Sequence, residues 1–199
     1  MVEIKAFNKW SVEGIKIQDV GLERYINLQP KFVPKTGARY AGKRFHKSNV
    51  FIVERFINKI MGSGHKAKKH VFTSEKNTGK AQTAYRIFET ALEIVEFRTK
   101  KNPLAVLVKA IENAAPREEI ITIEYGGARY PKAVECAPQR RIDMVIKLMA
   151  QGVYQKTFGT KKDASEAWAD EIIAAYGLSS NSAAIQKKLE LERQADSSR

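Results

Sequence analysis

Cysteine and histidine are scarce in this sequence of 199 residues, which contains one cysteine and three histidines. The single Cys136 excludes an internal disulfide framework and a cysteine-rich zinc site. Long apolar runs are also missing, because no stretch approaches the roughly 18 residues that a membrane-spanning helix needs. The first residues, MVEIKAFNKWSVEG, contain no apolar signal core and no small-residue cleavage pattern. We therefore expect a soluble intracellular protein of the cytoplasm, with no membrane partner.

Acidic residues are too few to balance the basic ones. Asp and Glu number 22 against 35 Lys and Arg, which gives a formal net charge of +13. The excess lies in the first half of the chain, where residues 1–47 carry ten basic and four acidic side chains and residues 48–100 carry ten and five. Residues 158–199 are balanced, with six and seven. Like charges on a compact body repel one another, so this asymmetry indicates an anionic partner, with nucleic acid as the first candidate.

Catalytic motifs are missing as well. There is no Walker-type phosphate loop and no GxGxxG after a predicted strand, and the Gly-rich GSGHK follows a helix and lacks the P-loop spacing. Cys136 would need a nearby histidine to act as a nucleophile, and all three histidines lie far away, in the first half of the sequence. The acidic residues form no metal-binding cluster. The sequence thus predicts a protein that is not an enzyme and that needs no cofactor or metal ion.

Hydrophobic periodicity of about 3.6 residues dominates residues 48–199 and predicts a mainly α-helical domain of about six helices. Their expected ranges are 50–61, 79–99, 103–115, 163–176 and 182–195, with another helix opened by Pro138. In the first of them, Arg55 and Lys59 lie one turn apart, opposite the apolar stripe. Residues 1–47 show no sustained periodicity, so we interpret them as a basic N-terminal extension of the domain.

The period changes to two near residues 119–137, which predicts one antiparallel β-hairpin. Apolar and polar side chains alternate up to Gly126–Gly127, a strong turn signal, and alternate again on the return. The predicted tip carries Arg129, Tyr130 and, just beyond them, Lys132. Such a tip suits a groove or a single-stranded base. It is equally compatible with a plain connecting hairpin whose arginine is solvated.

Two further basic segments lie before the hairpin. The N-terminal extension ends in a basic stretch in which Phe32, Tyr40 and Phe45 alternate with cations, and the loop after residue 61 is rich in lysine. The cations are Lys31, Lys35, Arg39, Lys43, Arg44 and Lys47 in the stretch, and Lys66, Lys68 and Lys69 in the loop. Coinciding charge and aromatics favour contact with RNA phosphates and bases, although a loosely packed surface extension remains an alternative. Metal binding by His65 and His70 has a poor ligand set and ranks well below phosphate binding.

Four stretches of the sequence resemble a known family. They are FINKIMGSGHKAKKH, NPLAVLVKAIENAAP, GGARYPKAVECAPQRR and AAIQKKLELERQADSSR. They are similar to the small-subunit ribosomal protein seven family in its archaeal form, and the likeness covers roughly residues 48–199. The third stretch, with its Gly-Gly turn and the arginine pair Arg140–Arg141, is the most specific. The first 47 residues are the kind of extension that archaeal and eukaryotic members carry.

The resemblance implies a bundle of about six helices with a protruding β-ribbon and a structural, non-enzymatic role. It further implies binding to the 3′ major domain of small-subunit ribosomal RNA, nucleation of head assembly, and a place at the subunit interface near the decoding region and the transfer RNA exit site. Neighbouring ribosomal proteins of the head and platform would be partners, with exit-site transfer RNA and messenger RNA nearby. The RNA-contacting positions carried over by the resemblance are Lys66, Lys68, Lys69, Arg129, Tyr130, Lys132, Arg140 and Arg141.

Two other classes of protein have to be weighed against this reading. A helical DNA-binding or regulatory protein needs a recognition helix with base-reading side chains, and no predicted helix has an uninterrupted basic face. A hydrolase or nuclease needs a carboxylate or histidine cluster, which the sequence lacks. An RNA-binding role requires the basic segments to share one face of the molecule. It also leads us to expect that the acidic helix at 163–176 faces solvent or a basic protein neighbour.

Overall fold

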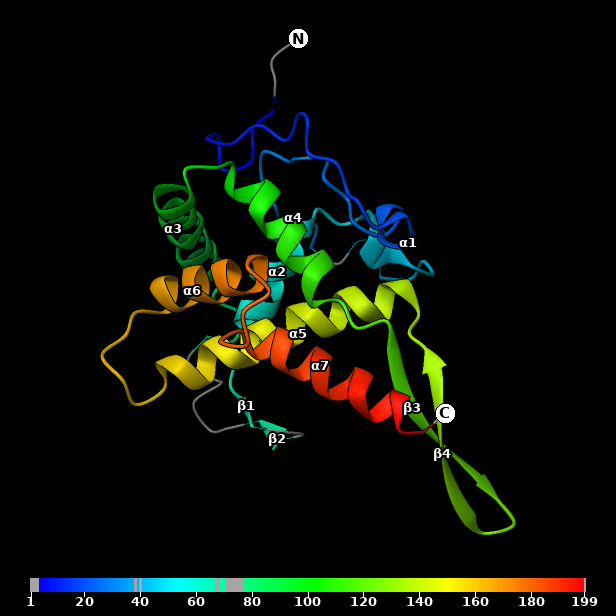
Figure 1. Ribbon diagram of the computed structural model, residues 1–199. Coiled ribbons are helices and arrows are strands. Elements are labelled where there is room, and N and C mark those ends of the chain that lie inside the picture. Colours follow the sequence, from blue (N-terminus) through cyan, green and yellow to red (C-terminus); the bar gives the residue numbers. More distant parts are fainter. Residues whose placement is uncertain (1–3, 38, 40, 67–68, 71–76, 199) are drawn as a thin grey trace.

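The computed structural model describes residues 4–37, 39, 41–66, 69–70 and 77–198, with the side chains of residues 65–66 and 69–70 left undescribed. Within this part the chain forms seven α-helices, a long β-hairpin and a two-residue strand pair (Figure 1). The helices are α1 (Val20–Glu23), α2 (Ile52–Met61), α3 (Ala81–Thr99), α4 (Pro103–Ala114), α5 (Pro138–Thr157), α6 (Ala164–Tyr176) and α7 (Ala183–Asp196). The expected mainly helical fold is confirmed. None of the helices described has the length and apolar character that crossing a membrane requires.

Helix α6 packs against α3, α4 and α5. Three aromatic rings form the middle of the core: Phe56 and Phe88 stack with their centroids 5.3 Å apart, and Trp168 meets each of them edge-on at 5.9 Å. All three side chains are buried. Edge-on and stacked rings gain packing energy beyond the burial of their area, so this cluster fixes α2, α3 and α6 relative to one another.

Helix starts follow the signals that the sequence carries. The side chain of Asn102 accepts a hydrogen bond from the Leu104 amide at 3.0 Å, and Pro103 is the first residue of α4. Asp163 caps α6, and Ser182 caps α7 by accepting from the Ile185 amide at 3.3 Å. Each cap satisfies an amide that the helix itself leaves unpaired. These local hydrogen bonds set the helix boundaries close to their predicted positions.

The hairpin consists of β3 (Glu118–Tyr125) and β4 (Ala128–Glu135), paired in antiparallel register. Its two-residue turn has φ of +58° at Gly126 and +82° at Gly127, a combination that matches the twist of paired strands and that glycine adopts without strain. The ribbon projects from the helical body (Figure 1). An isolated hairpin is marginal in water, and here α7 packs against β3 at its base.

The first part of the N-terminal extension belongs to the core. Ala6, Trp10, Leu22 and Ile26 are buried against the helices, and the Trp10 Nε1 donates to Glu96 Oε2 at 2.8 Å. Burying large apolar side chains stabilises a segment even where it has no regular structure. This packing explains why Arg55, expected on an exposed helix face, is only 7% exposed and donates to the carbonyl of Tyr25. The predicted domain boundary at residue 47 stays a prediction.

Candidate RNA interface

The hairpin presents its predicted site residues to solvent on two different faces. Tyr130 lies opposite Ile123 in the register, and Lys132 lies opposite Ile121, so these four side chains share one face. Arg129 lies on the other face, 75% exposed, with its Nε 3.6 Å from Glu124 Oε2. An exposed pair of this kind contributes little stability. The Arg129 guanidinium can therefore exchange its partner for a phosphate.

The arginine pair at the start of α5 divides into an outward and an inward residue. Arg140 is exposed, and its Nη2 donates to Glu119 Oε2 on β3 at 2.7 Å. Arg141 is buried, with Nε donating to the Pro116 carbonyl at 3.0 Å and Nη2 donating to Asp19 Oδ2 at 2.8 Å. Arg140 thus ties α5 to the hairpin base. Arg141 ties α5 to α1, and RNA contact by its side chain stays a prediction.

The basic stretch is fixed to the helical body at several points. Thr36 donates to Glu54 Oε1 of α2 twice, from its amide at 2.8 Å and from its hydroxyl at 2.6 Å. Further along, the Lys47 Nζ lies 3.1 Å from Asp143 Oδ2 of α5. Between these attachments the predicted RNA-contacting side chains Arg39, Lys43 and Arg44 are exposed. Before them, Lys35 is exposed and Lys31 is half-buried. The stretch therefore holds its cations in a defined place along α2 and α5.

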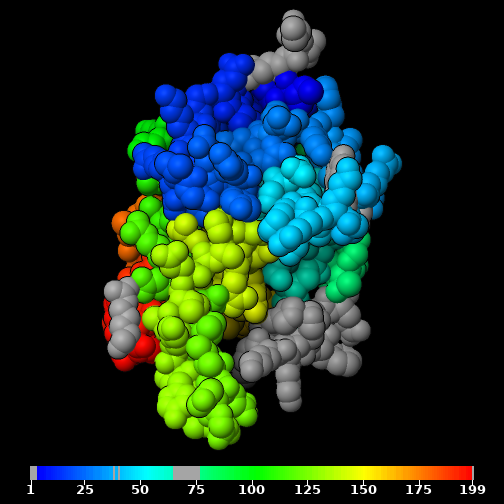
Figure 2. All heavy atoms as spheres, turned by 90° about the vertical axis from the view of Figure 1, so that its right-hand side faces the viewer, coloured from blue at the N-terminus to red at the C-terminus, as the bar shows by residue number. Residues whose placement is uncertain are grey.

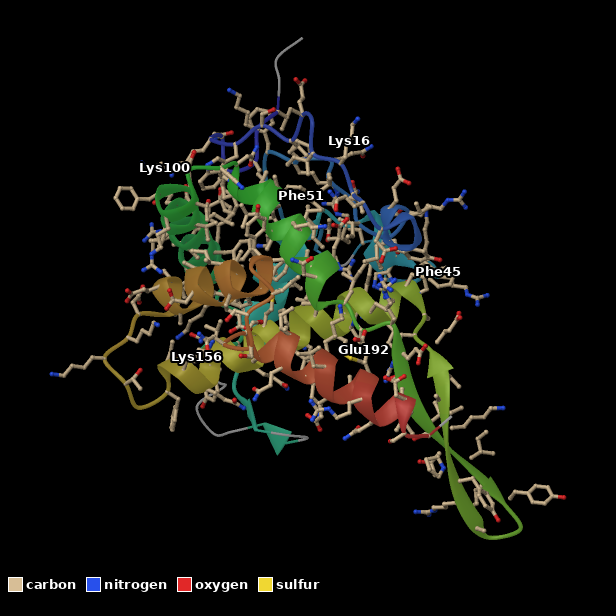
Figure 3. All side chains as sticks on the ribbon, in the orientation of Figure 1. Lys16, Phe45, Phe51, Lys100, Lys156 and Glu192 are labelled. Carbon is tan, nitrogen blue, oxygen red and sulfur yellow. The ribbon has the colours of Figure 1, made fainter. Side chains whose placement is uncertain are left out.

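Exposed aromatic rings accompany these cations. Phe32 and Phe45 are 67% and 50% exposed, and the Arg44 guanidinium carbon lies 5.0 Å from the centroid of the Phe45 ring. Phe45 lies at the same edge of the molecule as the start of α5 (Figure 3). Aromatic faces next to cations suit base stacking beside phosphate contacts. Tyr40 lies outside the described residues.

Lysines from three separate segments form a cluster that the sequence did not reveal as a site. Lys47, Lys59 of α2 and Lys147 of α5 lie close enough to influence one another, since the pKa of Lys59 is lowered by burial and by the charges of Lys147 and Lys47. Asp143 is the nearby carboxylate, and it also receives Arg55 Nη2 at 3.0 Å. The three lysines are 12 and 88 residues apart in sequence, so no local pattern signals them. Only the packing of α2 against α5 brings them together.

The lysine cluster opens into a groove of about 1,320 Å³, which we call the α2–α5 groove. Its walls come from residues 32–37, 46–47 and 79–83 together with α2 and α5. Figure 2 shows residues 30–50 (light blue to cyan), the start of α5 and the hairpin (yellow-green) on one face of the molecule. The basic stretch, the start of α5 and the hairpin therefore share one face of the molecule, as an RNA-binding role requires of them. In the lysine-rich loop, β1 (His65–Lys66) pairs with β2 (Lys69–His70), while Lys68 and the side chains of Lys66 and Lys69 lie outside the described residues.

Carboxylates of the acidic helix α6 pair with cations of the same chain. Arg98 of α3 pairs with Asp170 and Glu166, and Lys162 also pairs with Asp170. Glu171 is fully buried. Glu166 is 48% exposed and Asp163 is exposed, so these two carboxylates face solvent as expected, whereas Glu171 turns into the core.

The described residues give no support for an enzymatic activity. Among them, no group of three or more His, Cys, Asp or Glu side chains is placed to hold a metal ion. The Cys136 thiol is buried, and burial together with the charge of Glu119 raises its pKa to about 11. A thiol that stays protonated at neutral pH is a poor nucleophile. The arrangement suits binding of an extended anion rather than catalysis.

Comparison with known proteins agrees with the motifs and the geometry. Residues 22–199 match the family described as "Ribosomal protein S7p/S5e". The chain is 50% identical over 198 residues to the "Small ribosomal subunit protein uS7" of Nanoarchaeum equitans, with 100% of both chains covered. Proteins of the same name from Methanothrix thermoacetophila and Archaeoglobus fulgidus are each 45% identical; these matches cover 98% and 99% of this chain and 100% and 96% of the relatives. The resemblance found in the sequence is confirmed, and the chain belongs to the ribosomal protein S7p/S5e family as a ribosomal protein and not an enzyme.

Proposed function

We propose that the chain is a structural constituent of the small ribosomal subunit that binds the 3′ major domain of its RNA and helps to nucleate assembly of the head. Family membership supports the ribosomal part of this proposal. The observation that carries the RNA-binding part is the shared face of Figure 2, on which the basic stretch, the start of α5 and the hairpin lie together. A folded RNA junction presents phosphates over a comparable area, so one face with many cations suits it.

The binding mechanism follows from the two kinds of basic side chain on this face. Exposed cations such as Lys35, Lys43 and Lys132 neutralise phosphates and displace condensed counterions, which makes the affinity depend steeply on salt. The two arginines held in ion pairs act differently. Arg140 holds the hairpin base through Glu119, and Arg141 holds α5 through Asp19. These two arginines set the angle at which the ribbon leaves the body. Recognition by these cations is therefore by shape and backbone rather than by a base sequence.

The finer location of the protein is also part of the proposal. The projecting ribbon would lie at the subunit interface, near the decoding region, the exit-site transfer RNA and the messenger RNA. Tyr130 and the apolar residues that share its face are exposed on the ribbon, which suits a contact with bases or with a neighbouring protein. Ribosomal proteins of the head and platform would cover other surfaces of the helical body.

Binding to a head-domain fragment of small-subunit RNA across a salt series tests this function. The protein is compared with a hairpin variant, Arg129→Ala with Lys132→Ala, and with a control that removes the same charge elsewhere. Lys100→Asn with Lys161→Ala is suitable, because Lys100 lies at the end of α3 away from the hairpin (Figure 3) and its φ of +54° is one that asparagine tolerates. Unrelated folded RNA serves as competitor.

We expect the hairpin variant to bind the fragment about tenfold more weakly and to lose roughly two from the slope of log affinity against log salt. The control variant should keep the affinity of the unchanged protein. Its slope of log affinity against log salt should differ by less than about half a unit. Equal affinity of the protein for the fragment and for the unrelated RNA would contradict the proposal and would reduce the basic face to a general attraction for polyanions.

A further inference from the structure

The α2–α5 groove combines an apolar lining with an excess of positive charge. Phe32 and Val33 give it exposed apolar surface, and the buried Val50, Ile57 and Ile146 also line it. Six cations line the groove against two carboxylates. The cations are Lys35, Lys47, Arg55, Lys59, Lys80 and Lys147, and the carboxylates are Glu54 and Asp143. A purely electrostatic phosphate surface has no need of an apolar slot, so the groove suits a ligand that has both an apolar part and an anionic part.

The two carboxylates do not neutralise the whole cluster. Asp143 is shared between Lys47 and Arg55, at 3.1 and 3.0 Å. Among the described residues, Lys59 and Lys147 have no carboxylate at ion-pair distance, and the two charges repel each other. Lys59 is half-buried, so water screens that repulsion incompletely. An anion placed between the two ammonium groups would relieve it.

Glu54 supplies the second unusual feature of the groove. Its carboxylate is 1% exposed, and Oε1 accepts both hydrogen bonds from Thr36. The other oxygen, Oε2, is buried and has no hydrogen-bond partner within the described part of the chain. A buried acceptor without a donor is costly. Glu54 lines the groove, and a turn of its side chain would bring this oxygen to a ligand that also carries an N–H group.

We propose that the α2–α5 groove takes one unpaired nucleotide of the bound RNA, with its phosphate between Lys59 and Lys147, its base in the apolar slot and an exocyclic amino group of the base on Glu54 Oε2. The inference rests on the proposed function and names the RNA feature that this part of the interface reads. Unpaired bases are recognised in this way, by stacking and by hydrogen bonds to their edges. Adenine and cytosine carry such an amino group, whereas uracil carries a carbonyl oxygen in its place and is disfavoured.

Nucleoside monophosphates test the groove directly, with chemical shifts of the ¹⁵N-labelled full chain as the readout. AMP and CMP should shift the amides of residues 57–61 and 143–147 with millimolar affinity, and UMP should bind at least threefold more weakly, as expected for one lost hydrogen bond of about 0.7 kcal/mol or more. Inorganic phosphate alone should bind more weakly than any of them. The double change Lys59→Ala with Lys147→Ala should weaken AMP binding at least about fivefold, while the Lys100→Asn, Lys161→Ala control leaves it unchanged.

Glu54→Gln gives the sharper test, because it changes the hydrogen-bonding character of the site without changing its size. The glutamine oxygen still accepts from Thr36, and its amide nitrogen now donates where Oε2 accepted. The preference should therefore reverse, with UMP binding more tightly than AMP. Thermal unfolding followed by circular dichroism shows whether the variant is folded, and the Lys59, Lys147 variant provides an independent reading if it is not.

Failure of this inference can be told apart from failure of the proposed function. Equal binding of AMP, UMP and phosphate, or no shift at about 10 mM AMP, would overturn the nucleotide site even if the head-domain fragment binds specifically. Loss of specific binding to that fragment would overturn the function, whatever the titrations give. In the complex, dimethyl sulfate should find an unpaired adenine or cytosine protected by the protein and unprotected with Glu54→Gln. Identical protection by both proteins would count against the site.

Discussion

Lys156 of α5 donates from its Nζ to Oε2 of Glu171 of α6, at 2.6 Å, and Glu171 is completely buried. The same ammonium donates to the Asn181 carbonyl at 2.8 Å, and the Ser182 hydroxyl donates to Glu171 Oε1 at 2.7 Å. Because Ser182 also caps α7, the pair connects three helices at one point. The position of the terminal helix, and with it the support of the hairpin base, depends on this buried charge.

Replacing Lys156 by methionine should therefore destabilise the protein strongly. The change leaves the Glu171 carboxylate buried without a cation, and breaking a buried pair in this way costs about 3 kcal/mol. Glu171→Gln should cost less, about 1 kcal/mol, because Lys156 is 35% exposed and can turn to water. Urea denaturation measures both free energies of unfolding. Lys187→Met, which breaks an exposed pair with Glu190, should cost under about 0.5 kcal/mol. The opposite order for Lys156 and Glu171 would contradict the assignment.

Gly152 of α5 is required by the close approach of α7. A Cβ at this position would lie 2.5 Å from the Cβ of Ala183, the first residue of α7. Gly152→Ala should destabilise the protein by about 1–3 kcal/mol, since the overpacking outweighs the helix propensity that alanine gains. Adding Ala183→Gly removes the clash and should restore part of the loss. Gly62→Ala is the matched control, because its added Cβ meets nothing closer than 3.8 Å. Equal unfolding free energies for Gly152→Ala and the native chain would show that α7 is not seated as described.

Cys136 should react slowly with alkylating reagents in the native protein. Its pKa of about 11, raised by burial and by Glu119, compares with about 8.5 for a free thiol. The thiolate fraction at pH 8 is then lower by a factor of about 100 or more, and iodoacetamide alkylation should slow accordingly. The rate in concentrated urea gives the reference for the exposed thiol. A native rate within about threefold of that reference would contradict the buried, protonated state.

The helices and the hairpin were predictable because their signals are local. The Gly126–Gly127 turn and the alternating side chains around it fix the hairpin register, and Asn102–Pro103 marks the start of α4 within the sequence itself. Trp10 and Leu22 gave no such signal. They lie in an irregular segment, where one apolar residue at a time makes a contact that only the folded helices create.

The site was predictable only in part, for a related reason. Arg140 and Arg141 were expected to act together, yet adjacent residues of a helix point about 100° apart. Arg141 lies four residues before the buried Val145, on the apolar stripe, so helical spacing alone indicates that it turns inward. No comparable rule links Lys47, Lys59 and Lys147, because their proximity arises from the packing of α2 against α5.

The Asp19–Arg141 pair joins the N-terminal extension to α5. Burial by itself raises the pKa of the Asp19 carboxyl, but the hydrogen bond and charge of Arg141, helped by the Gly21 amide, outweigh it and lower the pKa. A carboxyl whose folded pKa lies below its unfolded value of about 3.9 stabilises the fold fully at higher pH. That contribution is lost as the pH falls through the lowered folded pKa.

Asp19→Asn should therefore cost about 1.5 kcal/mol at pH 7, where it removes a charged hydrogen bond that is partly exposed, and progressively less below about pH 4. Asparagine still accepts from the Gly21 amide as the cap of α1, so the loss reports on Arg141. Urea denaturation from pH 7 to about pH 2 measures the difference between the two proteins. Parallel curves for Asp19→Asn and the native chain would mean that Arg141 does not hold the extension through this carboxylate.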